Sequence, residues 1–277
     1  TLTTGQPITF DGSSGNVNGY GRLILTNGGT LKLSASLPQL ITGDASGRFI
    51  LSSSGGGILH TNGFNTTIDR VLIDSNPVTF IGSLTKSGAG TLTLASTNTY
   101  SGTTTITGGT LLVTGSIATS AATVLSSGTL GGTGTTGSVT VESGGTLAPG
   151  GENVGTLGTG PLTLKPGSNA NFQLGSSSDR VNVTGALGLG GSITLIDTGS
   201  AVSGSYTLLT HSGSRSGSVT IIPPSGFAAT LDLSSPGTVK VTLVASSFAT
   251  WRRGFFTSNE LADPLVSGPS ADKDRDG

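Results

Sequence analysis

The sequence predicts an all-β protein, and most directly a parallel β-helix built from short strands. A Gly-Thr-Leu triplet recurs along the chain, aliphatic residues alternate with hydroxyl residues around it, and glycine pairs separate the alternating runs. The composition agrees with this class, because 47 of the 277 residues are glycine and only 10% are charged. A net charge of −1 combined with regular Leu, Ile and Val positions indicates a folded chain.

The triplet recurs at an interval that is typical of one solenoid coil. The successive intervals between Gly90, Gly109, Gly128 and Gly145 are 19, 19 and 17 residues. The full set of triplets begins at Gly29, Gly90, Gly109, Gly128, Gly145 and Gly155.

Short strands are predicted wherever apolar residues recur at every second position. These pairs are Leu92 and Leu94, Val139 and Val141, Leu162 and Leu164, Val181 and Val183, and Ile193 and Leu195. Glycine pairs such as Gly108-Gly109 and Gly144-Gly145 can adopt the positive φ angles that turn a strand through a corner.

Strands this short bury little surface unless successive coils stack on one another. In a parallel β-helix each coil pairs with the next, and the inward aliphatic residues form a continuous ladder. Residues from Leu23 to Val244 leave room for about eleven coils at the observed period. An antiparallel β-sandwich array is the alternative, since it also uses short alternating strands.

The stretch "GAGTLTLASTNTYSGTTTITGGTLLV" resembles the autotransporter-associated β-strand repeat, also called the passenger-associated transport repeat. The residues that carry the resemblance are Lys86, Gly88, Gly90, Leu92, Leu94, the Asn98-Thr99-Tyr100 run, Gly102, Thr104, Gly109 and Leu111. Upstream, "GGGILHTNGFNTTI" is similar to the segment that often precedes this repeat, with His60 where an acid is more usual. Downstream, "ESGGTLAPGG" and "DRVNVTGALGLGGSITLI" resemble closing coils, so the likeness covers most of residues 55–245.

The resemblance implies a single-stranded right-handed parallel β-helix that is exported to the bacterial surface or released from it. We therefore predict a β-helix over residues 1–247, and we expect the chain to be a piece of a longer protein. Its localisation is expected to be extracellular or at the cell surface.

The composition changes after residue 247, where we predict a second segment, 248–277. Phe248, Trp251, Phe255 and Phe256 have the spacing of one face of a short amphipathic helix. That face would cap the last coil or dock a partner. The segment resembles the C-terminal region of exported repeat proteins from Verrucomicrobia and Planctomycetes.

The chain ends in a partial calcium-type loop. Asp272, Asp274 and Asp276 followed by Gly277 give the first half of an EF-hand-like ligand pattern, in which alternate carboxylates face one hard cation. The bidentate acid of such a loop would lie six residues past Gly277, so calcium is expected here only in a longer protein, and a solvated acidic linker is the alternative. No cofactor is expected to be required.

The candidate catalytic groups are few. Asp69, Arg70 and Asp74 are the richest cluster before the tail, but the odd offset between the two acids places them on opposite faces of a continuous strand. We interpret the cluster as a surface ion pair, and Asp179 with Arg180 as a similar pair at the start of a strand. His60 and His211 are expected to be surface or turn histidines.

The sequence also limits the classes of partner. The 13 basic residues are scattered singly, which argues against nucleic acid, and no apolar run approaches the length of a membrane-spanning helix. We predict a non-catalytic structural segment with an adhesin-like or stalk role, whose surface ligand is a polysaccharide or another cell. The alternative is a polysaccharide-binding or polysaccharide-degrading β-helix, for which one Trp and three Tyr offer few stacking platforms.

Overall fold

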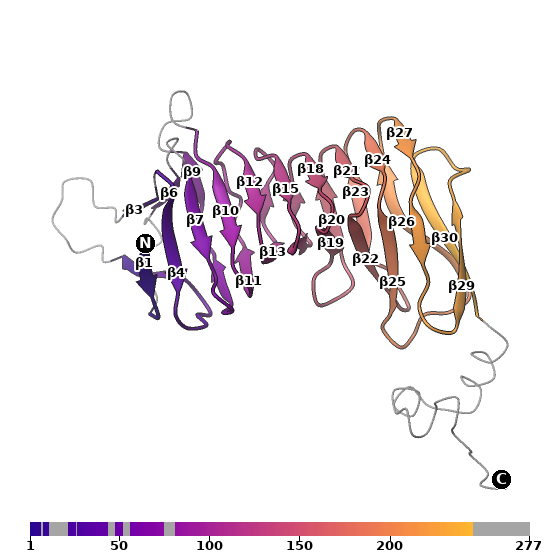
Figure 1. Cartoon of the computed structure of the whole chain (residues 1–277), viewed down its shortest axis with the longest axis horizontal. Helices are drawn as coiled ribbons and strands as arrows, with labels where there is room; N and C mark the ends of the chain where they lie inside the picture. Colours follow the sequence, from indigo (N-terminus) through magenta and orange to yellow (C-terminus); the bar gives the residue numbers. More distant parts are fainter. Residues whose placement is uncertain are drawn as a thin grey trace, which may run out of the picture.

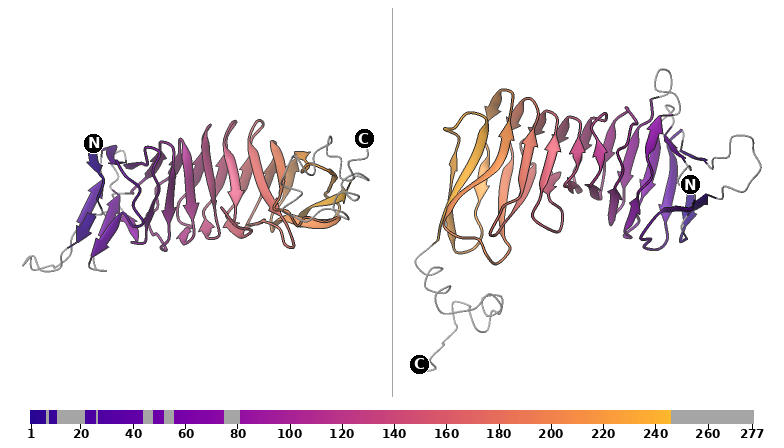
Figure 2. Two further views of the ribbon diagram at one scale, coloured as in Figure 1. Left: turned by 90° about the horizontal axis from the view of Figure 1, so that it is seen from below. Right: turned by 180° about the vertical axis from the view of Figure 1, so that it is seen from behind.

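The computed structural model describes residues 1–6, 8–10, 22–25, 27–43, 48–51, 56–74 and 81–245. Within these ranges the chain forms 30 β-strands and no helix. The strands stack coil upon coil along the long axis of the molecule (Figure 1), and two further views show the same rod from below and from behind (Figure 2). The predicted parallel β-helix is confirmed.

Three long sheets form the sides of the rod. Sheet 1 has ten strands in the order β1 (Leu2–Thr4), β4 (Gly29–Leu33), β7 (Gly57–His60), β10 (Leu84–Ser87), β12 (Thr104–Ile106), β15 (Ala122–Val124), β18 (Val139–Val141), β21 (Leu162–Leu164), β24 (Leu187–Leu189) and β27 (Arg215–Gly217). Sheet 2 has eight strands, β8 (Thr66–Ile68), β11 (Thr91–Leu94), β13 (Gly109–Val113), β16 (Gly128–Gly132), β19 (Thr146–Pro149), β22 (Asn169–Leu174), β25 (Ser192–Asp197) and β28 (Thr220–Ile222).

Sheet 3 has seven strands, in the order β14 (Ser116–Ile117), β17 (Thr135–Thr136), β20 (Thr156–Thr159), β23 (Arg180–Val183), β26 (Gly204–His211), β30 (Thr238–Ala245) and β29 (Phe227–Asp232). Two small parallel sheets lie near the N-terminal end, β2 (Ile8–Phe10) with β5 (Ile41–Gly43), and β3 (Arg22–Leu25) with β6 (Arg48–Leu51) and β9 (Leu72–Asp74).

The register places equivalent residues of successive coils directly above one another. In sheet 2, Leu92 pairs with Leu111, Leu111 with Leu130, and Leu130 with Leu147. All four side chains are completely buried, and each contributes about 1.5–3 kcal/mol by leaving water. The predicted inward positions on β11, β18, β21, β23 and β25 are all buried as well.

Threonine occupies the outward positions in the same register. On sheet 1, Thr85, Thr105, Thr123, Thr140 and Thr163 form one file across five successive strands. Threonine suits this position because it is β-branched and its hydroxyl is solvated.

The coil corners need glycine for two separate reasons. Gly90 has φ 91° and Gly109 has φ 63°, which are left-handed conformations that side chains disfavour. A Cβ atom at Gly90 would also lie 2.1 Å from the carbonyl oxygen of Phe64, on the preceding coil. Glycine at this corner therefore allows both the turn and the close approach of two coils.

The coils do not continue to Val244, so the prediction of about eleven parallel coils over that span is wrong at its C-terminal end. Strand β30 pairs antiparallel with β26 on one side and with β29 on the other. Pro223 and Pro224 follow β28 and cannot donate to a further parallel ladder. The chain turns back there, and β30 covers the edge of β26 that another coil would have paired.

Candidate functional site

Lys86 of the predicted repeat lies inside the rod. It takes an inward position on β10, in register with Leu59 of the preceding coil and Ile106 of the next, and its side chain is completely buried. The Lys86 ammonium donates to the carbonyl oxygens of Gly88 at 2.7 Å, Gly108 at 2.8 Å and Ser87 at 3.2 Å. Burial lowers the pKa of Lys86 to about 8.

His60 lies on the outer face of sheet 1, beside Ser87. Its Nδ1 is 3.0 Å from the Ser87 hydroxyl, and Lys32 is its register partner on the preceding coil. Burial lowers the pKa of His60, and the charges of Lys32 and Lys86 lower it further. A Ser–His nucleophile needs a group that stabilises the imidazolium, whereas here the two lysines oppose it.

The side chains of Asn98 and Tyr100, which lie between β11 and β12 of the repeat, form hydrogen bonds with neighbouring coils. The Asn98 side chain accepts from the Leu72 amide at 2.9 Å and donates to the Ser116 carbonyl at 3.0 Å, so it joins three coils. The Tyr100 hydroxyl is 2.6 Å from Thr104 Oγ1, which lies 2.7 Å from Ser120 Oγ. Burial raises the pKa of Tyr100 to about 12, so its hydroxyl stays protonated.

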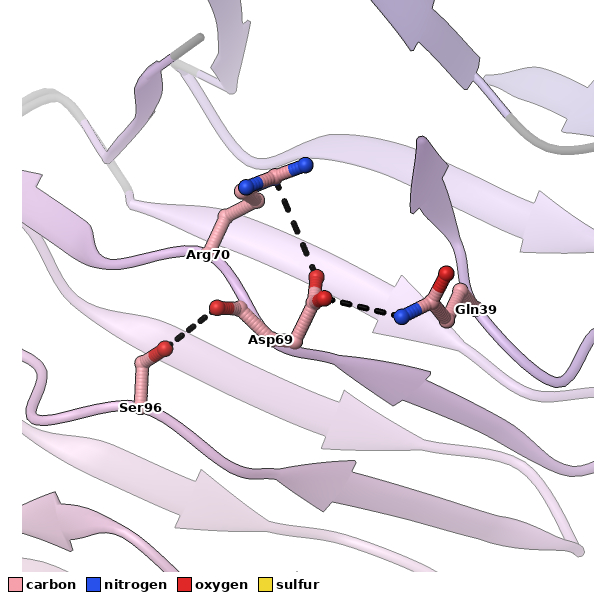
Figure 3. Close-up of polar contacts among 4 residues, drawn as sticks. All are labelled: Gln39, Asp69, Arg70 and Ser96. Atoms are coloured by element: carbon pink, nitrogen blue, oxygen red, sulfur yellow. Dashed lines mark hydrogen bonds and ion pairs between the residues drawn. The ribbon is translucent and has the colours of Figure 1, made fainter. Parts of the chain in front are cut away.

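Asp69, the first residue of the candidate cluster, lies between β8 and β9, and Figure 3 shows its polar contacts. One carboxylate oxygen is 3.8 Å from Arg70 Nε, and the other accepts from Gln39 Nε2 at 2.8 Å. Its carbonyl oxygen accepts from the Ser96 hydroxyl. The predicted ion pair between Asp69 and Arg70 is confirmed. The neighbouring polar groups are the side-chain amide of Gln39 and the hydroxyl of Ser96.

Asp74 does not join this pair, so the prediction of a surface ion pair is wrong for this residue. It is 7% exposed at the end of β9, and its carboxylate accepts from the Gly82 amide at 2.6 Å. The amide and hydroxyl of Ser101 donate to the same carboxylate at 3.1 Å and 2.7 Å. Asp74 therefore fixes two loops of neighbouring coils, because each donor would be left unpaired without it.

Asp179 is also buried, contrary to its interpretation as part of a surface pair with Arg180. Its two carboxylate oxygens accept from the amides of Gly155 and Gln173, each at 2.8 Å. It is 1% exposed, and burial raises its pKa above the ordinary value. Arg180 is exposed at the start of β23. Asp179 thus anchors the loop that contains Gly155.

His211 lies at the end of β26, where its Nδ1 is 2.8 Å from the carbonyl oxygen of Gly213. That contact fits the turn histidine expected there. Over the described ranges, no three His, Cys, Asp or Glu residues lie close enough together to hold a metal ion. Asp272, Asp274, Asp276 and the aromatic segment beginning at Phe248 lie outside the described residues, so the calcium and helix predictions remain predictions.

Sequence reasoning missed the burial of Lys86, Asp74 and Asp179. For Lys86 a signal was present, because it occupies the alternate position at which neighbouring coils carry an aliphatic residue. Asp74 and Asp179 lie beside corners of the coils, and the sequence does not predict the backbone conformation of these corners.

The comparisons with known proteins agree with the repeat. Residues 84–113 match the family model described as passenger-associated-transport-repeat. The match spans β10, β11, β12 and β13, and so includes Lys86, Asn98 and Tyr100. No curated protein matches the chain. In the part of the chain that the structure describes, no helix is long and apolar enough to cross a membrane. Residues 84–113 therefore match a passenger-associated transport repeat, and they lie within a parallel β-helix.

Proposed function

We propose that this chain is a non-catalytic, rigid structural segment of an exported bacterial surface or secreted protein, with a stalk or adhesin-like role. The repeat match supports export, because the family is named for transported passenger segments. The observation that carries the proposal is the uninterrupted register of sheet 1 over ten strands. A continuous parallel ladder resists bending because each coil is hydrogen-bonded and packed against its neighbours.

The polar groups of the rod fit this role better than catalysis. Asp69 contacts Arg70 and Gln39, Asp74 binds the loop at Ser101, and Asp179 binds backbone amides. Glycoside hydrolysis typically needs two carboxyl groups that flank the scissile glycosidic bond. These three acids each hold a corner or a loop, and a structural role explains their positions.

Distance measurements along the rod test the proposal. The chain has no native cysteine, so spin labels can be placed at Ser34→Cys and Ser218→Cys, which follow β4 and β27. Eight inter-strand steps separate these strands, which gives roughly 38 Å at about 4.8 Å a step. A control pair at Ser126→Cys, which follows β15, and Ser218→Cys spans four steps, or roughly 19 Å.

A rigid rod gives two narrow distance distributions by double electron–electron resonance, with the longer mean about twice the shorter. A broad distribution for the longer pair, or a mean that does not scale with the number of coils, would refute the stalk role.

A further inference from the structure

A trough of about 560 Å³ lies on the outer face of sheet 2. Its floor carries Thr67 on β8 and Thr91 and Thr93 on β11, all half-buried. Thr67 and Thr93 are register partners on neighbouring strands, so their hydroxyls repeat at the strand spacing. The volume falls within the range of about 300–1,000 Å³ that is usual for ligand sites.

The wall at the N-terminal end of the trough is the segment of Ser36, Leu37 and Pro38. The Leu37 amide donates to the Asn65 carbonyl at 2.9 Å, and the Leu40 amide donates to the Thr67 carbonyl at 2.8 Å. Two backbone hydrogen bonds therefore tie this wall to the coil that forms the floor.

Leu112 and Glu152 close the opposite end. Glu152 belongs to the loop that Asp179 anchors through Gly155, and Gln173 Nε2 donates to the Gly151 carbonyl at 3.0 Å. A Cβ atom at Gly151 would lie 3.3 Å from Leu112 Cδ2, so the loop lies against that side chain. Both walls are thus fixed by contacts to the rod, and the trough is preformed.

The lining determines which ligands fit. Among the described residues, the floor hydroxyls of Thr67, Thr91 and Thr93 make no hydrogen bond to another protein group. The backbone of β11 is already paired on both sides, by β8 and β13, so an extended peptide cannot add to it as a strand. Glu152 is the charged residue of the lining, which disfavours anions.

We infer that this trough binds a neutral oligosaccharide, as a segment of an uncharged polysaccharide. Sugar hydroxyls can both donate to and accept from the threonine hydroxyls of the floor. Pro38 and Leu112 give apolar surface for the C–H faces of the sugar rings. The Glu152 carboxylate can accept a hydrogen bond from a neutral sugar hydroxyl, so the ligand need not be positively charged. The inference goes beyond the stalk role and does not depend on it.

Calorimetric titration of the full chain with four uncharged hexasaccharides tests the inference: cellohexaose, xylohexaose, mannohexaose and maltohexaose. Hexagalacturonate serves as the anionic probe. The test variant is Thr67→Val with Thr93→Val, which removes two floor hydroxyls and keeps the side-chain volume. The control is Thr123→Val with Thr140→Val, the same change at register partners on sheet 1, away from the trough.

We expect at least one neutral hexasaccharide to bind, the trough variant to weaken that binding about tenfold or more, and the control variant to leave it unchanged. Hexagalacturonate should not bind. Circular dichroism checks folding, and each single variant replaces the double one if the latter fails to fold. The inference is overturned if all four neutral probes fail to bind, if hexagalacturonate binds equally well, or if the trough and control variants behave alike. None of these results bears on the spin-label distances, so the two proposals fail separately.

Discussion

The buried ammonium of Lys86 makes the stability of the rod depend on pH in an unusual direction. Its pKa falls from 10.5 in the unfolded chain to about 8 in the folded protein, because burial penalises the charged form. Between these two values the unfolded chain binds a proton that the folded chain does not. The free energy of unfolding therefore rises with pH across this window, and the destabilisation is fully present below pH 8.

The magnitude follows from the difference in pKa. A shift of one pKa unit corresponds to about 1.4 kcal/mol, so raising the pH from about 7 to 10 should stabilise the protein by roughly 2 to 3 kcal/mol. The three carbonyl groups that accept from the ammonium act against this gain, since they favour the charged form. We expect desolvation to be the larger effect on the pKa of Lys86, because no carboxylate contacts Lys86 among the described residues.

Urea denaturation, followed by circular dichroism at a series of pH values, measures the effect. The comparison variant is Lys86→Met, which keeps a flexible side chain in the ladder and removes the titrating group. Wild type should gain stability relative to Lys86→Met as the pH rises, and the Lys86 13Cε NMR resonance, assigned with that variant, should titrate near pH 8. Parallel pH dependence of the two proteins, or a titration midpoint above about 10, would show that the carbonyl groups fully offset desolvation.

Three substitutions test the remaining contacts, each by urea denaturation. Gly90→Ala should destabilise the protein by about 2 kcal/mol or more beyond Gly63→Ala, because φ is 91° and 89° at the two sites but only Gly90 faces a backbone oxygen; equal losses would contradict the close approach. Asp74→Ala should cost about 2–4 kcal/mol because it leaves the Gly82 and Ser101 donors unpaired, and a loss below about 1 kcal/mol would argue against that role. Tyr100→Phe should cost about 1–2 kcal/mol by removing the hydroxyl bonded to Thr104, whereas a neutral effect would mean that this bond adds nothing net.

The repeating part of the fold could be predicted from the sequence because successive coils repeat the same sequence pattern. Leu92, Leu111, Leu130 and Leu147 each follow a Gly-Thr pair, and the structure stacks them in register. A period of two fixes which side chains point inward, and the triplet interval gives the number of residues in each coil.

The candidate site is harder to predict because the alternation of inward and outward residues along a strand does not continue through a corner. The odd offset puts Asp69 and Asp74 on opposite faces only if one strand is continuous, but β8 ends at Ile68 and β9 begins at Leu72. The turn between them resets the alternation, so the offset of five residues says nothing about the face of Asp74. Its burial depends on Gly82, which precedes β10, and on Ser101, which precedes β12 one coil further on.

The antiparallel end of the rod shows a second limit of the same kind. Strand β30 alternates inward and outward residues as the coil strands do, because parallel and antiparallel strands share a period of two. The eight residues of β26 and of β30, against three to six in the strands of sheets 1 and 2, and the proline pair before β29 are the signals that mark the antiparallel end. Alternation therefore predicts which residues are buried, whereas strand length and breakers decide where the coils end.

Polar residues beside the coil corners also explain how a uniform rod can carry a specific site. A ladder of identical coils presents the same outer face throughout, so a local hollow requires loops that leave the rod and are held in place. Asp179 and Gln173 fix the loop of Glu152, and the Leu37 and Leu40 amides fix the opposite wall. The buried Asp179 therefore affects the shape of the outer surface, because the Gly155 amide that it binds belongs to the loop that forms one wall of the trough.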